Sequence, residues 1–329
     1  MLSYVIRRIL YIIPTLILMS IISFLIMQLP PGDYLTSYSA QLASRGTVAS
    51  REALEALRIR YGLGQPNYIQ YLKWVSGFPR GDFGIAMSLT DTPVSEVIGE
   101  RLMLTLILSS ITLILILGIA IPVGIYSATH KYTIMDYFLT FISFVGLSIP
   151  AFLLALTSLF VSVFYFNAQS VGGLFSSHYI GLPWSWGKII DFIKHLPVPI
   201  IVMGAAGTAG TMRIMRGNLL DILDQQYITT ARAKGLKERT VIFKHAVRIA
   251  INPIISRIGV NLPEILCGSI IVSIVLHLPT LGPMFYRSLI AQDMYLAGTI
   301  LLIFSVILLL GNLMADILLA WSDPRIRYD

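Results

Sequence analysis

The sequence has little charge. Only 12% of its 329 residues are Asp, Glu, Lys or Arg, whereas a soluble protein has roughly 25%. Hydrophobic residues make up 56% of the chain, so an ordinary water-soluble domain is excluded. The single cysteine, Cys267, excludes an intrachain disulfide and a cysteine zinc cluster.

Motifs of ATP hydrolysis and of other catalysis are also lacking. A phosphate-binding loop needs Gly-x4-Gly-Lys and then Ser or Thr, because the backbone amides, the lysine and the hydroxyl each contact phosphate or Mg²⁺. The nearest segment, Gly187-Lys188-Ile189, has Leu182 in place of the first glycine. The five histidines show no metal-ligand spacing. We therefore expect no catalytic site, metal or cofactor in this chain.

Long apolar runs are abundant. About 20 apolar residues are needed to cross a hydrocarbon core of roughly 30 Å. Runs of this length predict an all-α integral membrane protein with six transmembrane helices, at 1–29, 104–128, 137–165, 196–216, 254–276 and 294–320. The first run follows Arg7 and Arg8 but is not followed by a small-x-small cleavage site, so we expect it to be retained as a span. An insertion of about 70 residues, 30–101, separates this span from a core at 102–329.

The basic residues indicate the orientation of these spans. If both termini are cytoplasmic, 14 of the 24 Lys and Arg residues lie on the cytoplasmic side, nine of them between Arg213 and Arg257. The two short outer loops contain only Lys188, Lys194 and Arg287. The net charge of +7 is thus explained by membrane orientation, and we expect no nucleic-acid partner.

Two polar segments stand out from the apolar chain. In the outer insertion we expect a helix at 50–61 with Ser50 as its N-cap, and a second from Pro66 to Gly77. This insertion is either a small packed cap or a docking platform for a secreted or lipid-anchored partner. In the inner loop, 217–253, we expect two short helices joined at Gly235, the second capped by Thr240. They either lie on the membrane surface or dock a cytoplasmic partner.

Three features within the spans are candidates for a pathway. Gly207 and Gly210 belong to a run of small residues that suits close helix packing or a narrow section of a translocation path. Pro150 breaks a backbone hydrogen bond and favours a kink. Glu264 is an acidic residue deep in a predicted span, where a carboxylate costs at least about 2.5 kcal/mol. It lines a pore or pairs with a neighbouring helix.

The inner loop carries a family resemblance. Residues 227–236 read Tyr-Ile-Thr-Thr-Ala-Arg-Ala-Lys-Gly-Leu, and His245-Ala-Val-Arg248 and Asn252-Pro253 follow. This resembles the ATPase-contacting loop of ABC importer permeases, most closely the first-permease (B-type) branch of the dipeptide, oligopeptide and nickel family. That branch commonly reads Ala-Arg-Ala-Lys-Gly-Leu and His-x-x-Arg, whereas only Ala231 and Gly235 match the general Glu-Ala-Ala-x3-Gly form. Ordered matches continue at 31–33, 62–63, 81–84, 278–282, where Thr280 replaces a glycine, and 323–325.

The resemblance implies a type I importer permease that forms half of a pore in the plasma membrane of a prokaryote. It implies as partners a second homologous permease, two ATP-binding subunits that use ATP and Mg²⁺, an extracytoplasmic substrate-binding protein and the lipid bilayer. It implies peptides as substrates, with oligosaccharides or nickel complexes as alternatives. An ion-coupled secondary transporter would need mid-membrane charges, often within inverted repeats, and we find no clear repeat. A membrane enzyme is disfavoured because no nucleophile, base or metal cluster recurs within the spans.

The resemblance also indicates site residues. Ala231, Ala233 and Gly235 are expected to allow close approach of the ATPase, and Tyr227 and Leu236 to provide apolar anchors. Arg232, Lys234 and Arg248 are expected to make polar or lipid-headgroup contacts. The coupling residues are Tyr227, Thr229, Thr230, Ala231, Arg232, Ala233, Lys234, Gly235, Leu236, His245 and Arg248, and the pore candidates are Glu264, Gly207 and Gly210.

Overall fold

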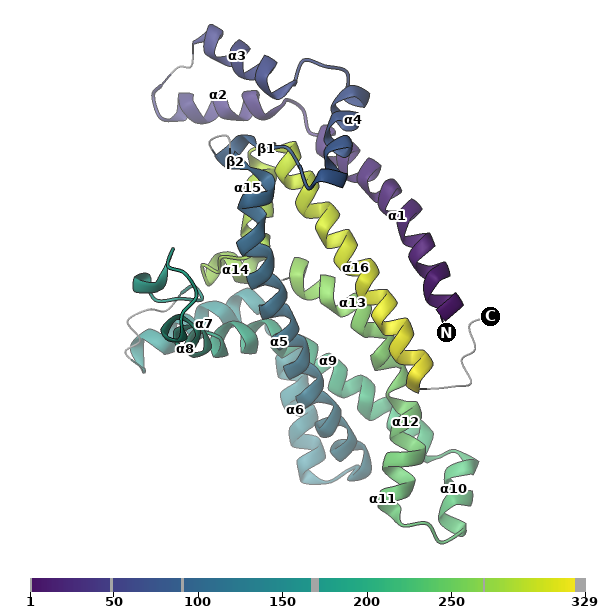
Figure 1. The fold of residues 1–329 in the computed structure, drawn as a ribbon. Coiled ribbons are helices and arrows are strands. Elements are labelled where there is room, and N and C mark those ends of the chain that lie inside the picture. Colours follow the sequence, from purple (N-terminus) through teal and green to yellow (C-terminus); the bar gives the residue numbers. More distant parts are fainter. Residues whose placement is uncertain (1, 48–49, 90–91, 167–171, 269, 323–329) are drawn as a thin grey trace. The chain divides into compact units, whose positions relative to one another are not determined.

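The computed structural model describes residues 2–47, 50–89, 92–166, 172–268 and 270–322, of which the side chains of 2–5, 260–264, 266–268 and 322 are outside the description. The described chain is mostly helical (Figure 1). It divides into two compact units. Unit 1 contains Met1–Val5, which includes the first residues of α1, together with Leu106–Pro279 and Leu308–Asp329, and unit 2 contains Ile6–Thr105 and Thr280–Ile307.

Unit 2 begins with the long apolar helix α1 and continues with three 11-residue helices. Its elements are α1 (Leu2–Gln28), α2 (Tyr34–Ser44), α3 (Arg51–Tyr61), α4 (Asn67–Gly77), η1 (Phe78–Arg80), β1 (Ile85–Ala86), η2 (Met87–Leu89), β2 (Thr92–Pro93), the start of α5 (Val94–Thr129), α15 (Leu281–Ile290) and the start of α16 (Met294–Ser322). The strands β1 and β2 pair antiparallel. The expected cap is present, since Ser50 Oγ accepts a hydrogen bond from Ala53 N. Helix α2 was not predicted from the sequence. It begins with a capping box between Asp33 and Thr36.

An aromatic cluster forms the core of unit 2. Phe24 of α1 lies between Tyr71 and Trp74 of α4, with ring centroids 5.5 and 6.2 Å away. Gly298 of α16 lies under the indole of Trp74, because a Cβ there would be 3.1 Å from Trp74 Cζ2. The cluster therefore packs three elements that are distant in the sequence into one unit.

Unit 1 is built around α9. Its elements are the rest of α5, α6 (Ile134–Ser148), α7 (Ala151–Phe164), η3 (Ser177–Tyr179), α8 (Trp186–His195), α9 (Pro197–Leu223), α10 (Gln226–Ala233), α11 (Glu238–Thr240), the π-helical turn η4 (Val241–Ala246), α12 (Val247–Ala250), α13 (Asn252–Gly268), α14 (Ile270–Val275) and the end of α16. Helix α9 packs against α6, α7, α8, α12 and α13.

Glycines allow the helices of unit 1 to approach closely. A Cβ on Gly124 of α5 would lie 2.9 Å from the carbonyl oxygen of Met212 in α9. One on Gly259 of α13 would lie 2.7 Å from Cα of Asn312 in α16. Larger residues cannot be placed at these crossings without moving a helix.

Four helices in the described chain are long and apolar enough to cross a membrane: Ile6–Gln28, Val94–Thr129, Pro197–Leu223 and Met294–Trp321. The pair α6 and α7 is a fifth candidate. The expected span at 254–276 comprises α13, of 17 residues, and α14, of 6 residues, on either side of residue 269.

The expected span at 137–165 is not one straight helix. Helices α6 and α7 are bent by 101° at Ile149 and Pro150. Proline disfavours the helical conformation of the residue before it, and Ile149 accordingly has the extended angles φ −83° and ψ 121°. The proline predicted a kink, but the observed bend turns the chain by about a right angle.

Candidate functional site

Part of the connection between α9 and α13 forms a compact projection of unit 1, here called the α10–η4 segment (Gln226–Ala246) (Figure 1). Helix α9 ends at Leu223 and α10 begins two residues after Asp224. The chain turns at Gly235, whose φ of +76° lies in the left-handed region that glycine favours. Two short helices thus meet at this glycine as expected. The expected cap is wrong, because the second helix begins at Glu238 with Lys237 in the cap position, and Thr240 makes no capping hydrogen bond.

The inner face of the α10–η4 segment is packed onto the rest of unit 1. Ile228, Val241 and Ala246 are fully buried, in one cluster with Met215 of α9 and Ile254 of α13. Ala231 belongs to the same cluster and is 8% exposed. Ala231 therefore packs within this chain, which differs from the expectation that it leaves room for a partner. The cluster joins the segment to both α9 and α13.

The outer face of the segment contains most of the expected coupling residues. Tyr227 and Leu236 are 43% and 41% exposed. His245 is half-buried within η4. The remaining exposed positions of the segment are Thr229, Thr230, Arg232, Ala233, Lys234 and Gly235, and Arg248 is exposed on α12.

An ion pair spans the turn at Gly235. Arg232 Nη2 lies 2.8 Å from Glu238 Oε1, and Arg232 Nε lies 3.2 Å from Oε2. The hydrogen bonds from Arg232 hold the pKa of the Glu238 carboxyl below its usual range. From the sequence, Arg232 was expected to contact a partner or lipid headgroups, and its pairing with Glu238 was not predicted. Both side chains are exposed, so the pair orients the turn more than it adds to stability.

A buried ion pair fixes α9 just before the segment. Arg216 Nη2 lies 2.8 Å from Asp136 Oδ2, and Arg216 Nε lies 2.9 Å from Oδ1. Ser127 of α5 donates to Asp136 and accepts from Arg216 Nε at 3.1 Å. The backbone N–H of Tyr132 also donates to Asp136, at 3.0 Å. This cluster joins the end of α5, the start of α6 and α9.

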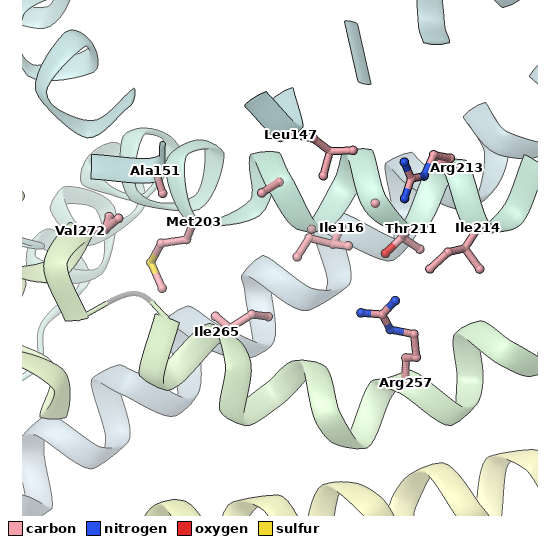
Figure 2. A pocket seen from close by; sticks show the side chains of 13 residues that line it. Ile116, Leu147, Ala151, Met203, Thr211, Arg213, Ile214, Arg257, Ile265 and Val272 are labelled. Carbon is pink, nitrogen blue, oxygen red and sulfur yellow. The ribbon is translucent and has the colours of Figure 1, made fainter. Parts of the chain in front are cut away.

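A cavity of about 420 Å³ lies between the helices of unit 1, with walls from α5, α6, α7, α9, α13 and α14 (Figure 2). Gly207 and Gly210 both line it. A Cβ on Gly207 would meet Ile116 at 2.8 Å, whereas a Cβ on Gly210 would have only Leu147 Cδ2 nearby, at 4.0 Å. Gly207 therefore allows close helix packing and also lines the cavity. At Gly210 the position of a Cβ borders free space.

Two arginines that the sequence analysis missed project into this cavity. Arg213 comes from α9 and Arg257 from α13, and their guanidinium groups lie at the same end of it (Figure 2). Met203, Ile265 and Val272 give the other end an apolar lining (Figure 2). Arg257 was identifiable as a candidate site residue from the sequence, because it is a charged residue within the apolar run at 254–276. The side chain of Glu264, the third pore candidate, lies outside the described residues.

The length and apolar composition of α1, α5, α9 and α16 are those of membrane-spanning helices. Residues 120–328 match the family described as binding-protein-dependent transport system inner membrane component, and residues 1–109 match its N-terminal region. The chain belongs to this family, whose members are transport proteins of the inner membrane.

Curated relatives match the chain along its length. It is 41% identical over 331 residues to the oligopeptide transport system permease protein AppB of Bacillus subtilis, with all of both chains covered. It is 34% identical over 328 residues to the glutathione transport system permease protein GsiC of Escherichia coli strain K12, again with all of both chains covered. A putative peptide permease protein of Brucella suis is 30% identical over 99% of both chains.

Asp136→Asn tests the buried ion pair. The change leaves the partly exposed Arg216 without its counter-charge and weakens its charge-assisted hydrogen bonds, so we expect a loss of about 1–3 kcal/mol of stability, measured as a lower midpoint of thermal unfolding in lipid nanodiscs. Asp221→Asn makes the same change at an exposed position of α9 and should leave the midpoint unchanged. Equal midpoints for the two variants would contradict the role of the pair.

Proposed function

We propose that this chain is a permease subunit of an ATP-driven importer and forms half of its pore, with the α10–η4 segment docking cytoplasmic ATPase subunits. One observation carries the proposal: α9 and α13 both hold the segment, through Met215 and Ile254, and both line the cavity. A displacement of the segment therefore moves two walls of the cavity. Its exposed outer face supplies the docking surface, and the resemblance of residues 227–236 to an ATPase-contacting loop supports this assignment.

The proposed topology has six spans and both termini in the cytoplasm. The bent pair α6 and α7 forms the third span, and α13 with α14 forms the fifth. Nine basic residues from Arg213 to Arg257 favour the cytoplasmic side for the α10–η4 segment. The insertion at 30–101 then lies outside, where a substrate-binding protein docks. The two other proposed partners are a second, homologous permease and a pair of ATP-binding subunits.

This chain is proposed to bind no cofactor and to catalyse no reaction. ATP and Mg²⁺ are used by the ATP-binding subunits, since residues 1–329 contain no Gly-x4-Gly-Lys-Ser/Thr motif.

Peptides are the proposed substrates. The relatives described above are named as oligopeptide, glutathione and peptide permeases. The cavity agrees with this choice, because Arg213 and Arg257 present positive charge beside an apolar wall. A peptide has a carboxylate and apolar side chains, which match the two kinds of lining. Oligosaccharides and nickel complexes are the alternatives, and binding assays with the cognate binding protein distinguish the three.

Gly235→Val tests the docking surface. No atom lies within 4 Å of the position of a Cβ at Gly235, so within this chain the change costs only left-handed strain of about 1–2 kcal/mol. A docked ATPase would meet the new side chain, so we expect loss of ATP-driven peptide uptake in proteoliposomes and loss of co-purifying ATPase subunits. Gly181→Val is the matched control, with φ +77° and equally open space. Normal uptake by Gly235→Val would refute the assignment.

Gly210→Phe tests the cavity as part of the pathway. The ring enters open space and fills much of the cavity, so we expect uptake to fall at least about tenfold while ATPase subunits still co-purify. Gly118→Phe on α5 is the control, since Gly118 is exposed and has no neighbour within 4 Å. If both variants transport as well as the unmodified complex, the cavity is not on the pathway.

A further inference from the structure

A second cavity lies in unit 2, separate from the one between the spans of unit 1. Its volume is about 800 Å³, within the range of about 300–1,000 Å³ for small-molecule sites. Its walls come from α2, η2, α5, α15 and the start of α16. None of the coupling or pore residues described above lines it.

The cavity is lined by positive charge. Arg45 follows α2, Arg101 belongs to α5 and Arg287 to α15, and no acidic residue is among the described residues that line the cavity. None of the three guanidinium groups has a hydrogen-bond or ion-pair partner in the described part of the chain. Arg101 is partly buried, whereas Arg45 and Arg287 are exposed, and the positive charge of Arg287 acts unfavourably on Arg101. Glu100 attracts Arg101 but does not line the cavity.

A partly buried cation with further positive charge beside it favours the binding of an anion. Guanidinium groups suit a carboxylate in particular, because their N–H groups match its two oxygens. The charges of this cavity therefore indicate an anionic ligand, and their geometry suits a carboxylate.

Hydrogen bonds that do not involve the arginines hold the walls of the cavity in place. Ser37 Oγ of α2 donates to Gln292 Oε1 at 2.8 Å, and Gln292 Nε2 donates to the carbonyl oxygen of Pro31 at 3.2 Å. The carboxylate of Asp293, which is fully buried, accepts from Ser88 N at 2.9 Å and from Ser88 Oγ at 2.8 Å. These bonds join α2, η2 and the turn before α16, so the cavity exists before a ligand arrives.

Tyrosines provide an aromatic wall beside the arginines. Tyr34 and Tyr38 stack with ring centroids 5.8 Å apart, and both line the cavity. Tyr286 of α15 also lines it and is 49% exposed. Aromatic surface next to cationic groups suits a ligand that combines a carboxylate with apolar parts.

We propose that this cavity binds the transported solute on its way to the pore, with the solute's carboxylate between Arg101 and Arg287 and its apolar part against Tyr38 and Tyr286. The site selects solutes with a free carboxylate and rejects their neutral counterparts. The inference rests on the proposed function for two points, the outward position of this region and the peptide nature of the solute.

The test measures binding to the full chain in nanodiscs of neutral phosphatidylcholine. One probe is trialanine with a fluorophore on its amino end, and the other is the same labelled peptide with a carboxyl-terminal amide. Fluorescence anisotropy measures the binding of each probe. We expect the acid to bind at least about tenfold more tightly than the amide. Arg101→Gln and Arg287→Gln should each weaken binding of the acid about tenfold and leave binding of the amide unchanged. Arg80→Gln, at an exposed position of η1 outside the cavity, should behave as the unmodified chain.

Besides arginine variants that keep the preference for the acid, three results would overturn the proposal. The first is equal binding of acid and amide by the unmodified chain. The second is an equal loss for both probes in the arginine variants, which would indicate that these residues hold something other than the carboxylate, such as an acidic side chain of the binding protein. The third is loss of probe binding in phosphatidylglycerol nanodiscs, because a lipid headgroup would then occupy the cavity.

ATP-driven uptake by the complete transporter is measured separately and tests the proposed function. If the probe binds as expected but unlabelled trialanine is not accumulated, the importer function fails and the cavity stands only as a carboxylate-binding site. If uptake is ATP-driven but the arginine variants keep the preference for the acid, only the present inference fails.

Discussion

The ion pair between Asp136 and Arg216 is the interaction on which unit 1 depends most. Asp136 is 1% exposed, and its carboxylate receives hydrogen bonds from Arg216, Ser127 and the backbone of Tyr132. A buried charge is tolerated only when its partners satisfy it. The cluster therefore fixes the end of α5, the start of α6 and α9 relative to one another, at the point where α9 leads into the α10–η4 segment.

The mechanism we propose follows from that rigidity. The buried face of the segment, with Ile228 at its centre, is packed on α9 and α13, and further along both helices line the cavity. Packed interiors transmit displacement because they contain little free space. Glycines in the middle of α9 give the cavity its space, since Gly210 has a single neighbouring atom at 4.0 Å. Helix α9 is therefore held in place near its C-terminal end, whereas its middle borders the cavity.

Local features of this fold were predictable from the sequence. Apolar runs located the long helices, Ser50 and Gly62 mark the ends of α3, and Gly235 marked the turn. These signals depend on residues that are near in sequence. The contacts between helices were not predictable, because they join residues that are distant in sequence. Arg216 contacts Asp136, which is 80 positions away. Arg257 lines the same cavity as Arg213 only because α9 and α13 are packed together. The inward orientation of Ala231 likewise depends on the cluster around Met215.

The central claim is that the α10–η4 segment lies in the cytoplasm and docks ATPase subunits. The most direct measurement is labelling of Leu236→Cys with a membrane-impermeant maleimide, in a chain that also carries Cys267→Ser. We predict labelling in inside-out vesicles without ATPase subunits, protection when these subunits are present, and no labelling in right-side-out vesicles. Tyr68→Cys on α4, where Tyr68 is 67% exposed, should show the opposite sidedness. Labelling at position 236 from the outside, or equal labelling with and without the ATPase subunits, would contradict the account.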